Sequence, residues 1–212
     1  MDFTSRMVEL LGTIRREMNG ETASSMRYYG KAYGLNYGVS LPTLRTMARA
    51  EKQDYEFAKY LYQQDIRELR LAALWIADAD CLTVAEMPFW AAGIINSELA
   101  AEAAQALVSR CEPLSALFAA WTTEGQSPVI QYAALLGAAR NPRITIEFLE
   151  PTAKVIRHNP DDRLTAQGAV ALLAVLGEKK ENRDAIFSTI GSLGSTPSAD
   201  FIHEELTWRF EE

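Results

Sequence analysis

Apolar residues recur every three to four positions along most of this 212-residue chain. Side chains at that spacing lie on one face of an α-helix, so the pattern predicts a succession of amphipathic helices. No segment shows sustained period-two alternation with β-branched residues, and we therefore expect essentially no sheet. The pattern is clearest at the N-terminus, where it predicts a first helix from Phe3, Met7, Leu10, Leu11, Ile14 and Met18.

Local signals mark where several helices begin. Pro42 suits the first turn of a helix over about residues 41–50. Asp54 can cap the helix that follows it. Residues 83–86 have the capping-box pattern at the head of a helix that runs to about Ile95. Later helices are predicted to start where a capping residue precedes a proline, at Ser127-Pro128, Asn141-Pro142 and Thr196-Pro197.

The most distinctive stretch covers residues 26–45, which contain four tyrosines, three glycines and three basic residues. We predict a helix over residues 22–33, on which Tyr29 and Tyr33 share a face. Gly34 and Gly38 then end it in a tight turn, because glycine tolerates positive φ. The stretch is either an ordinary helix junction with half-buried tyrosines or a surface that faces a ligand.

A weak internal repeat suggests how the helices are arranged. Pairs of small residues lie near positions 72–73, 103–104, 133–134 and 168–169, about 31, 30 and 35 residues apart. A second helical pattern lies between successive pairs. We therefore predict an all-α, right-handed α-solenoid of HEAT-like helix pairs, with about a dozen helices in one domain over residues 1–212. A nonrepeating helical bundle is the alternative.

Composition narrows the class of protein further. The apolar share of 48% and the charged share of 23% are typical of a soluble globular protein. We expect no signal peptide and no membrane span. The only cysteines, Cys81 and Cys111, are expected to be reduced core thiols, and with only two histidines no metal site or other cofactor is predicted. The sequence thus indicates a cytoplasmic protein, which we expect to be a monomer.

Charge is distributed unevenly along the chain. The net charge of −7 argues against strong nonspecific binding to nucleic acid, which depends on Lys and Arg. Residues 1–70 nevertheless carry 11 basic and 9 acidic residues, against 3 and 9 in residues 71–150 and 7 and 10 in residues 151–212. A local basic lining in the first third therefore remains compatible with the sequence, as does a mixed, solvated surface.

Several short motifs resemble those of the AlkD-like DNA alkylation repair family, which contains HEAT-like-repeat DNA glycosylases. The first is Arg27-Tyr28, followed by Gly38-Val39 and by Pro42 with Arg45. The resemblance extends over roughly residues 20–185 and includes the segments 68–74, 87–90 and 130–134. It implies a HEAT-like solenoid that holds duplex DNA in a basic concave cleft. It also implies excision of N3- and N7-alkylated purines without a metal.

That activity requires a carboxylate near the anomeric carbon and aromatic faces near the cationic base. In the family, the acid and one tryptophan lie four residues apart on the helix after the Pro-Phe motif. Counting from Pro88-Phe89 without gaps places them at Ala100 and Ala104. The groove arginine falls near Tyr132 and a second tryptophan near Ala171. The resemblance therefore carries the scaffold but not the catalytic set, which indicates a divergent member.

Other residues offer only partial substitutes. Glu98 and Glu102 are four residues apart, but we expect them to be solvated on another side of the helix. The four tryptophans are expected in the core. Tyr132 offers both a ring face and a hydroxyl. The candidate DNA contacts, which include Tyr132, are Arg27, Lys31, Arg45, Tyr132, Arg140, Arg143 and Arg163.

Two hypotheses follow. One is a DNA glycosylase for alkylated purines with rearranged catalytic groups. The other is a noncatalytic helical-repeat module, a pseudoenzyme that binds duplex DNA or, given the acidic balance, another protein. The missing acid and tryptophans favour the noncatalytic hypothesis.

Overall fold

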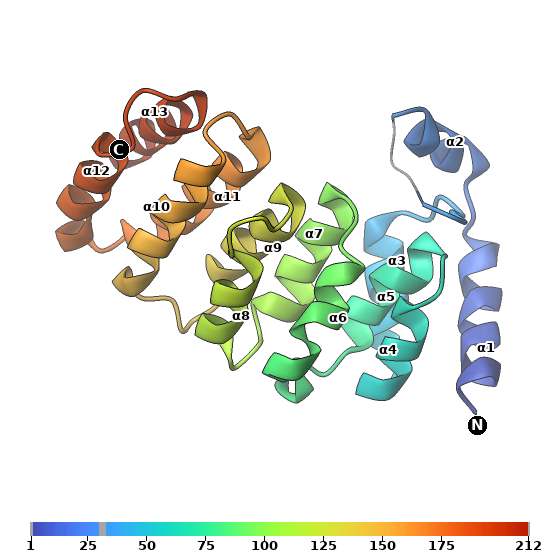
Figure 1. Ribbon diagram of the computed structural model, residues 1–212. Helices are drawn as coiled ribbons and strands as arrows, with labels where there is room; N and C mark the ends of the chain where they lie inside the picture. Colours follow the sequence, from blue (N-terminus) through green and yellow to red (C-terminus); the bar gives the residue numbers. More distant parts are fainter. Residues whose placement is uncertain (1, 30–32, 212) are drawn as a thin grey trace. The chain divides into compact units, whose positions relative to one another are not determined.

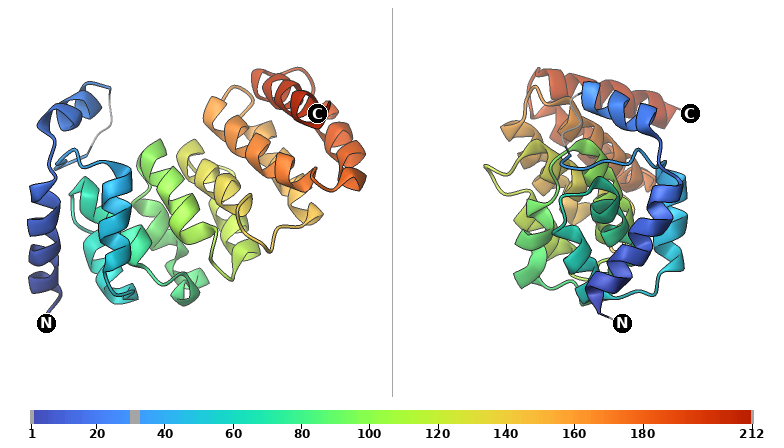
Figure 2. Two further views of the ribbon diagram at one scale, coloured as in Figure 1. Left: turned by 180° about the vertical axis from the view of Figure 1, so that it is seen from behind. Right: turned by 90° about the vertical axis from the view of Figure 1, so that its right-hand side faces the viewer.

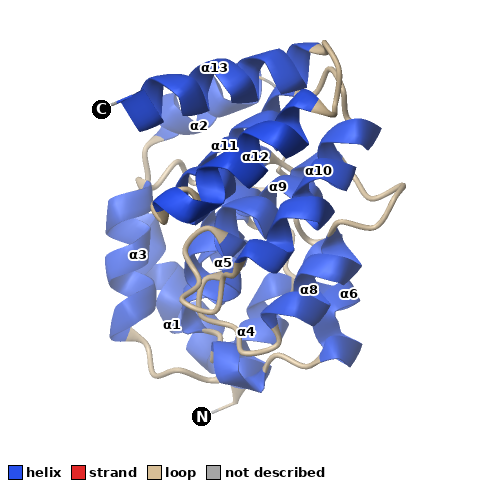
Figure 3. Cartoon of the chain, turned by 90° about the vertical axis from the view of Figure 1, so that its left-hand side faces the viewer, coloured by secondary structure: helices blue, strands red, loops and turns tan. Residues whose placement is uncertain are grey.

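The protein is described by a computed structural model that covers residues 2–29 and 33–211. Within these ranges it contains thirteen α-helices and no strand (Figures 1 and 3). Contacts divide the chain into two compact units, Met1–Cys81 and Leu82–Glu212. Each unit is described separately below, and a single domain over residues 1–212 stays a prediction.

The first unit contains five α-helices. They are α1 (Phe3–Arg16), α2 (Gly20–Tyr28), α3 (Leu41–Ala50), α4 (Tyr55–Tyr62) and α5 (Arg67–Ile76), followed by a short 3-10 turn, η1 (Ala79–Cys81). Helix α5 packs against both α3 and α4, and α1 packs against α4. Leu10, Leu11 and Ile14 bury the inner face of α1, whereas Met18 lies beyond the helix and is exposed. The predicted apolar face of the first helix is therefore confirmed at its centre, but the helix ends before Met18.

Short polar side chains start four of these helices. A side-chain oxygen accepts a hydrogen bond from the backbone N–H three residues later, which satisfies one of the free donors of the first turn. The predicted cap at Asp54 is confirmed, and the helix over residues 41–50 has the predicted bounds. The four pairs are Asp2 with Ser5, Asn19 with Thr22, Ser40 with Thr43 and Asp54 with Phe57.

Helix α2 is shorter than predicted. It ends at Tyr28, with Tyr29 as its C-terminal cap, and Tyr33 lies outside it. The prediction that Tyr29 and Tyr33 share a helix face is therefore wrong. The predicted positive φ is found at Gly38 and not at Gly34. Lys31 lies outside the described residues.

The second unit contains eight α-helices. They are α6 (Met87–Ala92), α7 (Ser97–Ala103), α8 (Leu114–Trp121), α9 (Pro128–Ala138), α10 (Leu149–His158), α11 (Arg163–Leu176), α12 (Arg183–Gly191) and α13 (Pro197–Glu211). Short 3-10 turns lie at η2 (Val84–Glu86), η4 (Ile146–Phe148) and η5 (Lys180–Asn182). Helix α7 continues into a π-helical segment, η3 (Ala104–Val108), in which Ser109 N–H donates to Ala104 O.

These helices form two rows. Helices α7, α9, α11 and α13 pack side by side in one row, and α8, α10 and α12 pack against α9, α11 and α13 in the other. The rows can be followed from green to red in Figure 2. Small residues let neighbours approach closely, since a Cβ on Gly137 would lie 2.4 Å from Val108 Cβ and one on Gly168 2.9 Å from Leu135 Cβ. The helix pairs and the close contacts at small residues agree with the predicted repeat.

Two predicted helix starts in this unit are wrong. Thr83 makes no side-chain cap, and its segment is a 3-10 turn before the short helix α6 rather than one helix to Ile95. Asn141 does not start a helix, and its buried side chain instead donates to the carbonyls of Val108 and Cys111, each at 3.0 Å. The starts at Ser127-Pro128 and Thr196-Pro197 are confirmed.

Among the described residues, no helix is both long enough and apolar enough to cross a bilayer.

Candidate nucleic-acid interface

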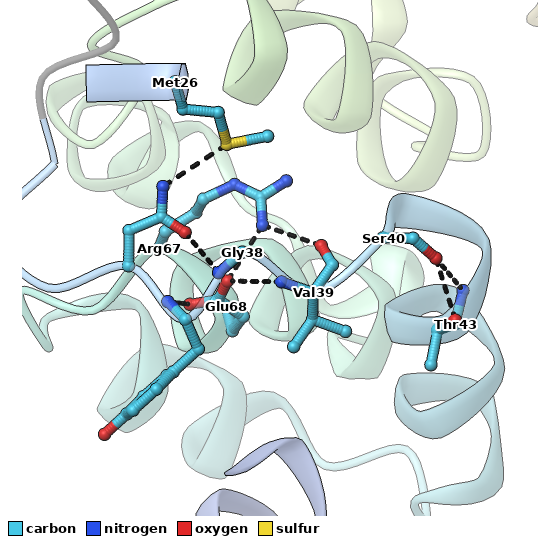
Figure 4. A network of polar contacts seen from close by, with 9 residues as sticks. Met26, Gly38, Val39, Ser40, Thr43, Arg67 and Glu68 are labelled. Carbon is cyan, nitrogen blue, oxygen red and sulfur yellow. Dashed lines mark hydrogen bonds and ion pairs between the residues drawn. The ribbon is translucent and has the colours of Figure 1, made fainter. Parts of the chain in front are cut away.

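A buried polar network holds the loop between α2 and α3 in the first unit (Figure 4). The Glu68 carboxylate accepts hydrogen bonds from the backbone N–H groups of Tyr37, at 3.1 Å, and Val39, at 3.3 Å. Arg67 Nη1 donates to Val39 O and to Glu68 Oε1, both at 2.9 Å. Because Arg67 and Glu68 begin α5, the network fixes the loop to the N-terminal end of that helix.

The same loop makes a tight turn at Gly38. Its φ is +72°, and an added Cβ would lie 2.1 Å from Asn19 O and 2.8 Å from Ala23 N, so a side chain does not fit. Asn36 Oδ1 accepts from Gly38 N–H at 2.7 Å, and Asn19 N–H donates to Tyr37 O at 2.8 Å. The loop thereby ties the start of α2 to the start of α3.

Helix α3, positioned by this loop, carries two arginines four residues apart. Arg45 and Arg49 lie on one face of the helix and extend over the indole ring of Trp75 on α5. The guanidinium carbons lie 5.7 and 4.3 Å from the ring centroid, respectively. Arg49 is exposed, and Arg45 and Trp75 are half-buried. Two guanidinium groups beside one indole ring form a compact cationic site of a kind that suits phosphate.

Arg27, the remaining described candidate in the first unit, lies elsewhere on it. It is exposed in the last turn of α2. The structure thus brings Arg45 together with Arg49, a residue that the candidate set omitted. The four-residue spacing of the two arginines within a predicted helix was the signal that could have identified Arg49.

In the second unit, Tyr132 lies on α9, and Arg140 lies in the turn that follows this helix. Tyr132 is half-buried, and its ring reaches the surface of α11, where a Cβ on Gly168 would lie 3.1 Å from Tyr132 Cδ2. Burial raises the pKa of Tyr132, and the positive charge of Arg140 opposes that rise. The phenol is therefore a neutral hydrogen-bond donor near pH 7. Arg140 is exposed and donates to Leu136 O.

The other two basic candidates lie elsewhere in this unit. Arg163 starts α11, and its guanidinium carbon lies 3.5 Å from the ring centroid of Phe201 on α13. Arg143 is exposed in the loop after α9. Its positive charge acts on the Cys111 thiol, whose pKa burial raises to about 11 against that influence. The described basic candidates of this unit thus form no single cluster with Tyr132.

The alanines at the expected catalytic positions do not line a surface. Ala100 and Ala104 are fully buried, and Ala171 is half-buried. The half-exposed positions of this segment are Ala101 and Gln105, and neither carries a carboxylate.

The expectation that Glu98 and Glu102 are solvated is wrong. Glu98 is only 9% exposed and Glu102 only 2% exposed. Burial of an ionised carboxylate is costly without polar partners, and both residues take part in further interactions.

The tryptophans and cysteines divide between core and surface. Trp90 and Trp121 are core residues as predicted, and Trp121 Nε1–H donates to Met87 O at 3.2 Å. Trp75 is half-buried and Trp208 is 62% exposed, so the core prediction is wrong for Trp208. Cys111 is buried and Cys81 is exposed, which corrects the prediction for Cys81. Within residues 2–29 and 33–211, no three His, Cys, Asp or Glu side chains cluster in a way that could hold a metal ion.

Comparison with known proteins gives the family. The model of the family described as "DNA alkylation repair enzyme" matches residues 11–163, which is well over half of the chain. The chain belongs to the DNA alkylation repair enzyme family. The matched residues include the buried Arg67–Glu68 network, the Arg45–Arg49–Trp75 cluster and Tyr132. No curated protein matches the chain.

A solved structure shares the fold. It is described as "A new family of proteins related to the HEAT-like repeat DNA glycosylases with affinity for branched DNA structures". The alignment covers 98% of this chain and 95% of that chain, with a TM-score of 0.68 and 15% sequence identity. The predicted HEAT-like helical fold is therefore confirmed.

Proposed function

We propose that this member of the DNA alkylation repair enzyme family binds DNA without excising bases. The loss of excision is supported by the residues of α7 and η3 and by their burial. Alanine occupies both positions at which the acid and tryptophan are expected, with no exposed surface at either. The half-exposed positions beside them, Ala101 and Gln105, supply no carboxylate to stabilise positive charge on a sugar.

The arginine pair supports the DNA-binding part of the proposal. Arg45 and Arg49 place two positive charges at one site, and Trp75 orients both guanidinium groups. Arginine side chains of this kind bind the phosphate backbone and supply much of the affinity for DNA. The structural neighbour with affinity for branched DNA supports the same assignment through its shared fold.

The charge balance favours the first unit for the main contact. Residues 1–81 carry 11 basic and 11 acidic residues, whereas residues 82–212 carry 10 basic and 17 acidic residues. Repulsion between phosphate and the second unit weakens binding there. In this proposal the arginine cluster provides the principal phosphate contact, and Tyr132 and Arg140 are secondary contacts.

Excision is tested with duplex DNA that contains 7-methylguanine. We expect release of the modified base at the spontaneous rate, with and without the protein. Faster release that is lost in a Tyr132→Phe variant would show a rearranged active site and overturn the noncatalytic assignment.

Binding is tested by titrating labelled duplex DNA at several salt concentrations. The Arg49→Ala variant is expected to bind more weakly, with a salt dependence reduced by about one unit of slope for the lost contact. Arg157→Ala is the matched control, since Arg157 lies on α10 and its Nη1 is 2.8 Å from Glu150 Oε1. Equal affinities of the two variants would remove the arginine cluster from the interface.

A second candidate, a protein-binding scaffold, is favoured by one feature of α13. Trp208 is 62% exposed beside a hollow of about 490 Å³ that is also lined by Glu204 and Glu211. An exposed indole among carboxylates suits a basic protein segment. Absence of DNA binding at low salt would favour this candidate. The cytoplasmic location and the monomeric state stay predictions.

A further inference from the structure

Two adjacent tyrosines at the end of α2 are among the most exposed aromatic residues of the protein. Tyr28 is 84% exposed and Tyr29 is 77% exposed. Their ring centroids lie 5.2 Å apart at an interplanar angle of 87°, an edge-to-face arrangement. In such a pair the edge of one ring covers part of one face of the other, so broad ring faces stay open to solvent.

The helix that carries the pair is anchored on both sides. At its start, Asn19 N–H donates to Tyr37 O at 2.8 Å. On its last turn, Asn36 Nδ2 donates to Met26 Sδ at 3.3 Å. The partners Asn36 and Tyr37 belong to the loop that Glu68 holds. Helix α2, which leads to the tyrosines, is therefore hydrogen-bonded to this loop, whereas the two rings are solvated.

Two neighbouring exposed rings present a large aromatic surface to solvent. Tyrosine offers a large flat surface and loses little conformational entropy on binding, because it has only two side-chain torsions. Exposed aromatic rings bind nucleic acid by stacking on the faces of bases. The bases of an intact duplex already stack on one another, so only unpaired bases present such faces.

We propose that Tyr28 and Tyr29 form a stacking platform for unpaired DNA bases, such as those at a branch point or a single-stranded end. This inference rests on the proposed DNA-binding function and adds the feature of the DNA that is selected. Arg27 is exposed in the same helical turn and contacts a phosphate next to the stacked base. The arginine cluster on α3 then supplies affinity for any DNA, and the tyrosine platform supplies preference for DNA with unpaired bases.

The test compares two DNA ligands and four forms of the full chain. The ligands are a plain duplex and a forked duplex of the same length with unpaired arms. The Tyr28→Ala/Tyr29→Ala variant is expected to lose about tenfold in affinity for the fork and to keep its affinity for the plain duplex. Tyr28→Phe/Tyr29→Phe retains both rings and is expected to bind as the parent protein does. Trp208→Ala removes an exposed aromatic ring from an acidic surface and is the matched control.

A second readout reports stacking directly. A 2-aminopurine in the unpaired arm is expected to lose fluorescence on binding the parent protein and the double phenylalanine variant, but not the double alanine variant. Equal loss of affinity for both ligands in the double alanine variant, or unchanged fork binding, would overturn the platform while leaving DNA binding intact. Failure of the parent protein to bind either ligand at low salt would instead overturn the proposed function. Circular dichroism of each variant checks that the helices are retained.

Discussion

Arg67 Nη1 lies 2.9 Å from Glu68 Oε1, and neither side chain has exposed surface. Consecutive residues do not face each other inside a helix, but these two occupy the first turn of α5, where both side chains reach back to the loop before α3. The carboxylate balances the buried guanidinium and accepts two backbone N–H groups, so several buried polar groups depend on one residue.

Replacement of Glu68 by glutamine is therefore expected to destabilise the protein by about 3 kcal/mol, because it leaves the Arg67 charge buried without this counter-charge. The amide side chain would also direct an NH₂ group toward backbone donors. Urea unfolding measures the loss. Glu56→Gln is the control, because Glu56 pairs with Lys59 at 3.5 Å on the exposed side of α4 and its loss costs about 0.5 kcal/mol. Similar losses in both variants would mean that the buried pair is not needed to hold the loop.

Gly38 and Gly125 distinguish two reasons why a position requires glycine, namely a positive φ and a lack of space for a side chain. Both have positive φ, +72° and +87°, so alanine costs about 1 kcal/mol or more at either position. At Gly38 an added Cβ would also lie 2.1 Å from Asn19 O, whereas nothing lies within 4 Å at Gly125. We expect Gly38→Ala to lower the thermal midpoint far more than Gly125→Ala. If the two midpoints fall by the same amount, the close approach of α2 to the turn is wrong.

The sequence predicted those features that depend on neighbouring residues. The caps at Asp54 and Ser127 and the bounds of α3 follow from residues within one turn. The Glu68 carboxylate, in contrast, meets backbone groups 29 and 31 residues away, and no local pattern encodes that contact. Counting without gaps placed the expected acid and tryptophan at Ala100 and Ala104, and both positions are fully buried. The π-helical segment from Ala104 to Val108 is a second feature that a three-residue or four-residue spacing rule does not anticipate.

The repeat hypothesis makes its own prediction at Gly137. A Cβ there would lie 2.4 Å from Val108 Cβ and 3.3 Å from Ala104 Cα, so α9 and η3 would have to separate. Gly137→Ala is expected to destabilise by about 1–3 kcal/mol through overpacking, despite the better helix propensity of alanine.

Gly12→Ala is the control for this substitution, because Gly12 lies inside α1 with nothing within 4 Å of an added Cβ. It is expected to stabilise the protein by about 0.5–1 kcal/mol. Chemical unfolding of both variants measures whether each substitution lowers or raises the free energy of unfolding. A neutral or stabilising effect of Gly137→Ala would contradict the close helix contact.

Asp54 links the start of α4 to the pH dependence of stability. Burial tends to raise the pKa of Asp54, but the Phe57 N–H and the Arg6 guanidinium, at 2.6 Å, outweigh it and hold the pKa below its usual value. Because the folded pKa is the lower one, the contribution to stability is complete above the unfolded pKa of about 3.9 and disappears as the pH falls through the folded pKa.

Asp54→Asn keeps a capping oxygen and removes only the charge, so we expect a loss of about 0.5 kcal/mol at pH 7, the size typical of a partly exposed ion pair. Urea unfolding of both proteins from pH 7 to pH 2.5 should give stabilities that converge at the acid end. A difference that persists unchanged at pH 2.5 would show that the charge of Asp54 is not its source.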